Sequence, residues 1–253
     1  MNKYHIPNLG KACEVIELIG NSPDGLMLKQ IYQPLEIPRT TALRITQTLL
    51  DAGFLAENEK SALVLGTALV QIGVKALDNL DIRGFARPIL KRLASETGES
   101  CHLAVLNAER SMLVEVADSP HPVRIAARPG TLVELHCSST GKVFLAFQIP
   151  EPAKFIQTLE LSPHTPNTDT TQKAVLASIE RTRKLGYAID EEEFVPGVRC
   201  IAAPVRNAFG KTVAAVGITA STSTFTKPKI RTMAEKLNHA VSEISANMGS
   251  GKK

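Results

Sequence analysis

The sequence lacks the features that mark membrane-spanning and secreted proteins. Its most apolar runs, such as Val213 to Ile218, are far shorter than the roughly 20 residues that cross a bilayer as a helix. The N-terminus has no basic segment followed by an apolar stretch, and the four cysteines are scattered without CxxC or Cys/His zinc spacing. We therefore expect a cytoplasmic protein with reduced thiols and no membrane partner.

Positive charge is scarce in the first third of the chain. Residues 1–80 hold seven Lys and Arg residues against eight Asp and Glu residues, although the whole chain carries a net charge of +4. Neutralisation of phosphates supplies most of the non-specific affinity of a protein for DNA. Nucleic-acid binding by this region is therefore expected to be modest per domain and to need two or more domains on one site.

Residues 28–53 are typical of two short helices joined by a tight turn. The first spans Leu28 to Leu35, and the second spans Pro38 to Leu50, with the proline at the first helical position, where no N–H is needed. Helical periodicity places an apolar face on the second helix, formed by Ala42, Leu43, Ile45, Leu49 and Leu50. Arg39 and Thr46 fall outside this pattern.

The opposite face of the second helix carries hydroxyl, guanidinium and amide groups that can reach phosphates and base edges. The candidate DNA-binding residues are Arg39, Thr40, Thr41, Arg44, Gln47 and Thr48. Arg39 is expected on a phosphate. A solvated polar face is the alternative interpretation, because any surface helix has one.

The surroundings of this helix pair favour the DNA-binding interpretation. An amphipathic helix is predicted over Asn8 to Ile19, with Leu9, Ala12, Cys13, Ile16 and Ile19 on its apolar face. Two short strands, Phe54-Leu55 and Leu63 to Leu65, flank a polar turn, as in a small hairpin. Three helices followed by a hairpin form a winged helix-turn-helix, which binds double-stranded DNA.

A helical segment follows over Thr67 to Thr97. Its apolar residues recur at helical spacing until Gly84 and Pro88, which predicts two consecutive helices with a break near Pro88. The apolar stripe consists of Leu69, Val70, Val74, Leu77 and Leu80. The first helix either links two domains and contacts a second copy, or packs on the C-terminal domain.

The chain beyond Glu99 alternates short β-rich runs with helical patterns, which predicts an α+β domain. The expected strands are Cys101 to Leu106, Met112 to Ala117, Arg124 to Ala127, Tyr187 to Ile189, Cys200 to Val205 and Val213 to Thr219. The expected helices are Ser139 to Phe147, Pro152 to Leu159, Thr170 to Leu185 and Thr226 to Met248. The predicted divisions are thus residues 1–66, 67–97 and 98–250.

Three segments of the chain carry a family resemblance. They are TGES at residues 97–100, LHCSSTGKVFLA at residues 135–146 and RKLGYAIDEEEFVPGVRCIAAPV at residues 183–205. In this order they closely resemble the IclR family of bacterial transcriptional regulators, over about residues 9–248. The third segment is the most specific.

The resemblance implies a winged helix-turn-helix, a linker helix and a C-terminal effector domain related to GAF and PAS folds. It also implies a homodimer or dimer of dimers on a palindromic operator, controlled by a small carboxylate, aromatic acid or sugar acid. The chain departs from the family pattern at Tyr32, Pro34, Glu36 and Leu63. Glu36 stands where the turn usually has Gly, and Pro34 predicts a short or bent helix.

The segment from His136 to Lys142 is a candidate anion site. Small polar residues at the start of a helix leave backbone N–H groups accessible, and the helix dipole favours a carboxylate there. The resemblance implies that Ser139 and Thr140 donate to that carboxylate. Alternatively, Ser138 and Ser139 merely cap the helix.

The resemblance places further residues in an effector pocket. Asp190 would accept from ligand hydroxyls, and Cys200 would close the cavity. Gly217 and Thr219 match two more pocket positions, with Gly217 leaving extra room, and Val133 and Leu135 would form apolar wall. For Asp190, the alternative is one member of a solvated acidic run.

Catalysis, metal binding and a protein partner are the alternative functions. Neighbouring His and Cys residues occur at Cys101-His102 and His136-Cys137, but adjacent residues in a strand point to opposite faces. A metal at His136, Cys137 and Cys200 is less favoured than the effector pocket. We expect a transcriptional regulator without enzymatic activity, metal or cofactor, and we favour a repressor over an activator. A regulator that acts through a protein partner is the second hypothesis, because residues 1–80 are not basic.

Overall fold

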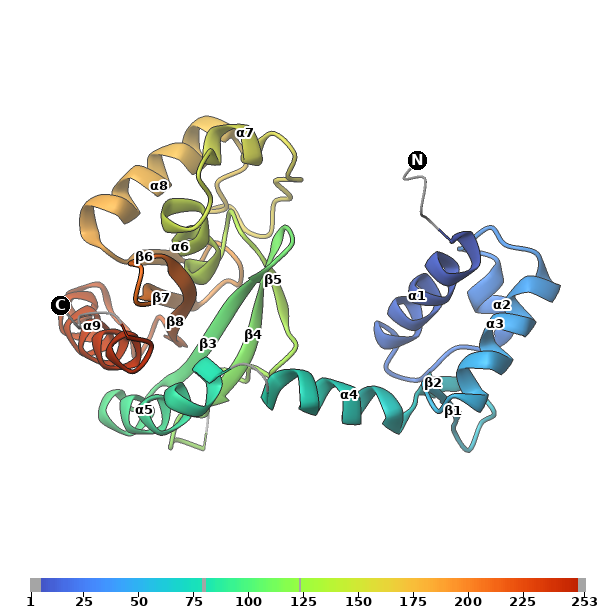
Figure 1. Ribbon diagram of the computed structural model, residues 1–253. Coiled ribbons are helices and arrows are strands. Elements are labelled where there is room, and N and C mark those ends of the chain that lie inside the picture. The colour runs from blue at the N-terminus through green and yellow to red at the C-terminus, as the bar shows by residue number, and fades with distance from the viewer. Residues whose placement is uncertain (1–5, 79–80, 123, 250–253) are drawn as a thin grey trace. The chain divides into compact units, whose positions relative to one another are not determined.

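The chain forms two compact units, Met1–Asn79 and Leu80–Lys253, in a computed structural model (Figure 1). The structure describes residues 6–78, 81–122 and 124–249. The interval expected as a linker, residues 67–97, is divided between the two units. Ser250, the expected end of the last domain, and Leu80 lie outside the described residues.

The first unit is a winged helix-turn-helix followed by one further helix. Its elements are α1 (Pro7–Gly20), α2 (Leu28–Tyr32), α3 (Arg39–Asp51), β1 (Leu55–Glu57), β2 (Leu63–Leu65) and α4 (Thr67–Asp78). The two strands are antiparallel, with Leu55 opposite Leu65. The core is formed by Val15, Ile19, Ile31, Ile45, Leu49, Leu55 and Leu63. The predicted hairpin wing is present.

Two expected apolar faces are rotated relative to the prediction. In α1, Val15 is buried, while Leu9 is 60% exposed and Cys13 is also exposed. The buried face follows Ala12, Val15, Ile16 and Ile19, so positions 9 and 13 fall at its edge. In α3, Leu43 is exposed and Thr46 is buried. The Thr46 hydroxyl donates to the Ala42 carbonyl at 3.0 Å, which satisfies this polar group inside the core.

Pro34 and Glu36 determine the conformation of the turn between α2 and α3. Helix α2 ends at Tyr32, short of the predicted Leu35, because Pro34 cannot supply a backbone donor. Glu36 adopts a left-handed conformation with φ of 51°, which explains why glycine suits this position. The Ile37 N–H then donates to the Tyr32 carbonyl at 3.2 Å, and Ile37 is buried.

The predicted break near Pro88 is wrong. Helix α5 (Asp81–Thr97) continues through Pro88, and the division between the two described helices falls between Asp78 and Asp81. The proline removes one hydrogen bond, but α5 buries an apolar face against the sheet and the last helix, which outweighs that loss. This face consists of Ile82, Ala86, Ile89, Leu90, Leu93 and Ala94. The side chains of Val74 and Leu77 lie outside the described ones.

The second unit is built on a six-stranded antiparallel sheet with the order β5-β4-β3-β8-β7-β6. The strands are β3 (Ser100–Asn107), β4 (Arg110–Ala117), β5 (Leu132–Glu134), β6 (Ala188–Glu191), β7 (Val198–Arg206) and β8 (Thr212–Ser221). The prediction of a strand over Arg124 to Ala127 is wrong. The Ile125 carbonyl of this segment accepts a hydrogen bond from the Ser100 hydroxyl at 3.1 Å. The edge of β4 pairs with β5 instead of with this segment.

Helices cover both faces of this sheet (Figure 1). The remaining helices are α6 (Ser139–Phe147), α7 (Pro152–Ile156), α8 (Gln172–Leu185), the 3-10 turn η1 (Lys227–Lys229) and α9 (Ile230–Asn247). Helix α6 packs between the sheet and α8, and α5 and α9 pack together against the sheet. Val143, Phe144 and Leu145 of α6 are fully buried. None of the described helices combines the length and apolar character needed to cross a membrane.

Two glycines in helices of this unit predict opposite effects of the same substitution. A Cβ at Gly141 would lie 2.4 Å from the Leu135 Cα, and backbone cannot move aside cheaply, whereas a Cβ at Gly84 would meet nothing within 4 Å. Gly141→Ala should therefore destabilise the protein by about 1–3 kcal/mol or more. Gly84→Ala should stabilise it by about 0.5–1 kcal/mol. Urea unfolding followed by circular dichroism measures both, and equal stability of the two variants would contradict the assignment.

Candidate functional site

A cavity of about 530 Å³ lies in the second unit, and every strand of the sheet contributes to its wall. The strand residues that line it are His102, Leu113, Val133, Asp190, Val198, Cys200 and Thr219. The remaining lining comes from Ser138, Ser139 and Thr140 at the start of α6, from residues 124–128 with Thr131, and from Phe194 and Val195. Such a size suits a small organic molecule.

The N-terminus of α6 faces this cavity. Ser138 caps the helix by accepting from the Gly141 N–H at 3.2 Å, while its own hydroxyl donates to the Glu134 carbonyl. The N–H groups of Ser139 and Thr140 belong to the first turn, where no intrahelical acceptor exists. The Thr140 hydroxyl is held 2.8 Å from the Ser111 hydroxyl. Capping by Ser138 is thus compatible with an anion at the next two residues.

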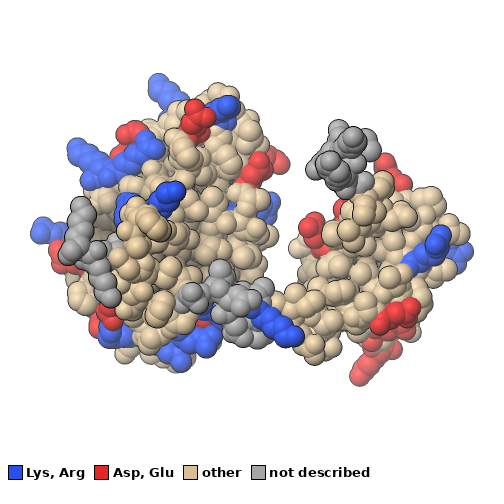
Figure 2. All heavy atoms as spheres, in the orientation of Figure 1, with Lys and Arg blue, Asp and Glu red and all other residues tan. Residues whose placement is uncertain are grey.

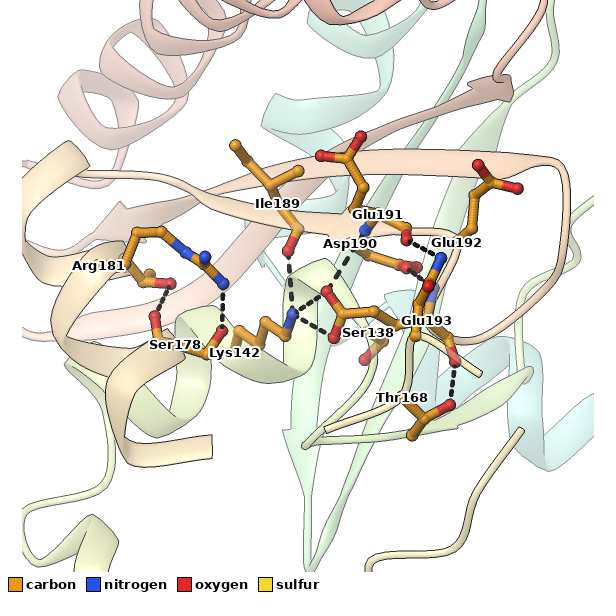
Figure 3. A network of polar contacts seen from close by, with 12 residues as sticks. Ser138, Lys142, Thr168, Ser178, Arg181, Ile189, Asp190, Glu191, Glu192 and Glu193 are labelled. Carbon is orange, nitrogen blue, oxygen red and sulfur yellow. Dashed lines mark hydrogen bonds and ion pairs between the residues drawn. The ribbon is translucent and has the colours of Figure 1, made fainter. Parts of the chain in front are cut away.

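A buried ion pair lies beside the cavity (Figure 3). The Nζ of Lys142, on α6, lies 2.5 Å from both carboxylate oxygens of Glu193 and donates to the Ile189 carbonyl at 3.0 Å. The Lys142 side chain is fully buried. The Asp190 carboxylate accepts from the Glu193 N–H at 2.8 Å. These contacts fix β6 and the loop after it against α6.

Burial sets the protonation of Asp190. Removal from water raises the pKa of the Asp190 carboxyl to about 7, although the Glu193 N–H and the Lys142 charge oppose the shift. Burial likewise raises the pKa of Glu193, and Lys142 again opposes it. Asp190 can therefore exist as an acid or as a carboxylate near neutral pH, so it can either donate to a ligand or accept from one.

Cys101, Cys200 and His102 lack the properties of a catalytic thiol and imidazole. Burial raises the pKa of Cys200 well above its ordinary value, and its Sγ lies 3.2 Å from the Thr219 hydroxyl. Burial also raises the pKa of Cys101 to about 12 and lowers the pKa of His102 to about 4. A thiolate nucleophile is thus disfavoured at these two cysteines. All four cysteines are free thiols.

The structure places the expected effector residues in two groups. Six of them line the cavity: Val133, Ser139, Thr140, Asp190, Cys200 and Thr219. Leu135 lies instead in the hydrophobic core under α6, because it follows the end of β5 in a turn. Gly217 lies beneath His102, whose Nε2 would be 2.4 Å from a Cβ at that position. The extra room expected at Gly217 is therefore filled by the imidazole of His102.

Sequence reasoning missed the cations beside this cavity. Arg124 and Arg128 line it, both are exposed, and Arg124 donates to the Asp118 carboxylate at 3.3 Å. Phe194 and Val195, in the loop after Glu193, were also missed. The two arginines lie in the segment HPVRIAARPG, so the signal was present, but assigning this segment to a strand concealed its position at a pocket.

The candidate DNA-binding residues lie on α3 of the first unit. Arg39, Thr40, Arg44, Gln47 and Thr48 are exposed, and Thr41 is half-buried. Together with residues of α1, Thr41, Arg44 and Thr48 also line a hollow of about 480 Å³. Two of these side chains are held by neighbours: the Gln47 amide donates to the Asp51 carboxylate at 2.9 Å, and the Thr48 hydroxyl donates to the Arg44 carbonyl at 2.8 Å.

Figure 2 shows both acidic and basic side chains on the visible face of the first unit, in keeping with the nearly balanced charge of residues 1–80. The outward side of α3 presents hydrogen-bonding groups, two of which are arginines. A winged helix-turn-helix followed by an α+β domain with a cavity defines a class of protein, the DNA-binding transcriptional regulators. The IclR C-terminal family of bacterial transcriptional regulators matches residues 74–246, and the IclR helix-turn-helix domain matches residues 9–59. The chain belongs to the IclR family of transcriptional regulators.

Known proteins of this family are similar over nearly the whole chain. The HTH-type transcriptional regulator BhcR of Paracoccus denitrificans is 30% identical, with 95% of this chain and 86% of that protein covered. The HTH-type transcriptional regulator KdgR of Escherichia coli is 29% identical, with 94% and 91% covered. The crystal structure of IclR from Thermotoga maritima has a TM-score of 0.74 and 29% identity, with 97% of this chain and 100% of that chain covered.

One solved structure with the same fold contains a ligand. It is an IclR homologue from Microbacterium hydrocarbonoxydans complexed with 4-hydroxybenzoate, with a TM-score of 0.82, 22% identity, and 95% of this chain and 98% of that chain covered. At this identity the similarity establishes the shared fold.

The raised pKa of Asp190 predicts a pH-dependent stability difference. Between the unfolded value near 4 and the folded value of about 7, the folded protein holds a proton that the unfolded chain has lost. The contribution of Asp190 to stability is therefore greatest below this interval and is lost as the pH rises through it. The free energy of unfolding of Asp190→Asn relative to wild type should increase from pH 4.5 to pH 7.5.

Urea unfolding at several pH values, followed by circular dichroism, measures this difference. Asp118→Asn is the matched control, since Asp118 is an exposed carboxylate in the same unit. A difference between Asp190→Asn and wild type that stays constant across the interval would refute the protonation assigned to Asp190.

Proposed function

We propose that this regulator senses a small organic acid in the cavity of the second unit and adjusts operator binding by α3 accordingly. The observation that carries the proposal is the arrangement of one cavity between the N-terminus of α6, Asp190 and two exposed arginines. A carboxylate fits the first turn of α6, where backbone N–H groups and the helix dipole both favour an anion. Arg124 and Arg128 add positive charge beside the same cavity.

The walls favour an acid with an apolar body and a hydroxyl group. Leu113, Val133, Val195 and Val198 give much of the lining an apolar character. Asp190 supplies an acceptor for a hydroxyl, and Phe194 supplies an aromatic face. An aromatic acid or a sugar acid meets these requirements, and the 4-hydroxybenzoate bound by the Microbacterium homologue has the same combination of groups.

The side chains of α3 would make different kinds of contact with DNA. Thr40, Arg44 and Gln47 would approach base edges in the major groove, while Arg39 would contact a phosphate at the start of the helix. Thr41 and Thr48 line the hollow beside α1 together with Arg44, and their short hydroxyl side chains would contact the DNA backbone. The modest charge of the unit supports a homodimer or dimer of dimers, in which two or more such helices bind half-sites together.

Effector binding would act on the distance between paired recognition helices. A dimer binds two half-sites that are about 34 Å apart, or a multiple of this, so a change in helix separation alters operator affinity. Repression with release by the effector is the proposed direction, because relatives include the HTH-type transcriptional repressor AllR of Escherichia coli.

The second candidate function is binding of a protein partner by the winged helix. It is favoured only by the excess of acidic residues in residues 1–80.

Arg44→Ala tests base reading by α3. If Arg44 contacts a base, the variant should lose about 1–3 kcal/mol of binding free energy on the operator, with relaxed discrimination at one position. Arg39→Ala is the matched control, because loss of a phosphate contact weakens binding to all sequences and reduces the salt dependence. Fluorescence anisotropy with DNA from upstream of the gene measures both. Unchanged operator binding by Arg44→Ala would remove it from the interface.

Coupling between the two sites is a separate prediction. A thermal-shift screen of small carboxylates identifies the effector, since a ligand that binds only the folded protein raises apparent stability. Linkage requires that operator DNA change the affinity for this effector by the factor with which the effector changes DNA affinity. Titrations with and without DNA should therefore differ. Equal effector affinities with and without DNA would contradict the switch. Ser139→Ala should weaken binding of the effector and leave DNA binding in the absence of the effector unchanged.

A further inference from the structure

Three metal-ligating side chains outside the cavity wall converge at the turn before α6. Ligand atoms of His136, Cys137 and His164 all lie within 4.8 Å of one another. His136 and Cys137 are buried, whereas His164 is exposed, with 27% of its side chain accessible to solvent. Neither the proposed effector site nor the DNA-binding helix uses any of the three.

The local backbone explains how two neighbours can point to one place. Adjacent residues alternate between faces in a strand, but residues 135–137 form a turn after β5, so this alternation does not apply. His136 and Cys137 can therefore present donor atoms on the same side. Cys200, which the sequence suggested as a third ligand, lines the cavity and is not in this group.

The third ligand comes from the long connection between α7 and α8. Its position is fixed by hydrogen bonds: the His164 N–H donates to the Thr168 hydroxyl at 3.1 Å, and that hydroxyl donates to the Glu193 carbonyl at 2.7 Å. The Thr165 hydroxyl donates to the Glu192 carbonyl at 2.7 Å. His164 is thus held beside the turn by contacts that do not involve its imidazole.

We propose that His136, Cys137 and His164 bind one Zn²⁺ ion per chain. Two imidazole nitrogens and a thiolate are a donor set that zinc prefers, and bonds of about 2.0–2.3 Å require only small side-chain movements from donors already this close. The Glu134 carboxylate lies 3.5 Å from the His164 Nε2 but is not among the three converging donors, so a water is the fourth ligand that we expect.

The surroundings of the group already resemble those of a metal ligand. The His136 Nε2 lies 3.0 Å from the Ser162 carbonyl and donates to it, which leaves the lone pair on Nδ1. A backbone carbonyl is one of the common partners that fix the second nitrogen of a metal-binding histidine. Glu134 adds negative charge beside the donors and offsets part of the charge of a cation.

A zinc ion here would join the irregular connection to the turn that leads into α6. Cys137 directly precedes the capping Ser138, and the His164 ring lies 5.0 Å from that of Phe194, which lines the cavity. Metal binding would therefore stabilise one end of the cavity. Zinc binding depends on neither the proposed effector nor DNA, so the zinc proposal and the proposed function can be refuted separately.

The test uses the full-length protein with any affinity tag removed. Wild type should bind one Zn²⁺ per chain in competition with a chromophoric chelator, and added Zn²⁺ should raise the melting temperature. Co²⁺ should give a thiolate-to-cobalt charge-transfer band. His164→Ala, at a partly exposed position, should weaken Zn²⁺ binding at least 100-fold, since loss of even an outer-shell partner typically costs about 10- to 100-fold. Cys137→Ser should abolish the cobalt band.

Matched controls separate the site from general effects. Cys13→Ser removes an exposed thiol from the first unit, and His239→Ala removes an exposed imidazole from α9, so both should bind Zn²⁺ like wild type. Circular dichroism confirms that each variant is folded. Absence of stoichiometric Zn²⁺ binding by wild type, or unchanged binding by His164→Ala, would overturn the proposal, as would loss of binding in either control.

Discussion

The buried ion pair between Lys142 and Glu193 is the constraint on which the second unit depends. The Lys142 side chain has no exposed surface and is paired with Glu193, and breaking such a buried pair typically costs about 3–5 kcal/mol because one charge remains buried and unpaired. The pair joins α6 to the loop after β6. As a result, the first turn of α6 and Asp190 face one cavity, although they lie far apart in the sequence.

Glycine and histidine complete this arrangement by close packing. Gly141 lets α6 approach the backbone of Leu135, which brings the capping Ser138 and the following N–H groups to the cavity. Gly217 accepts the ring of His102 from the paired strand, so an imidazole forms part of the wall. The shape of the cavity is therefore determined by close packing against two glycines, one met by the Leu135 backbone and the other by the His102 ring.

Local signals in the sequence predicted some elements closely and others not at all. Helices α3 and α6 were found nearly to the residue, because periodicity, a proline and capping residues act within one segment. The pocket positions Asp190, Cys200 and Thr219 came from the family resemblance. Three expectations were wrong: the strand at Arg124, the helix break at Pro88 and the extra room at Gly217. Each depends on contacts with segments distant in sequence, namely strand pairing, burial of the helix and the ring of His102.

The bond between Gln47 and Asp51 affects how α3 can approach a duplex. Asp51 ends the helix with an exposed carboxylate on the same side as Gln47, while Arg39 and unpaired N–H groups lie at the other end. Phosphates repel the first end and attract the second. In the proposed complex with DNA, this charge polarity along the helix axis would bring the N-terminal turn of α3 nearest to the phosphates and keep the Asp51 carboxylate away from them.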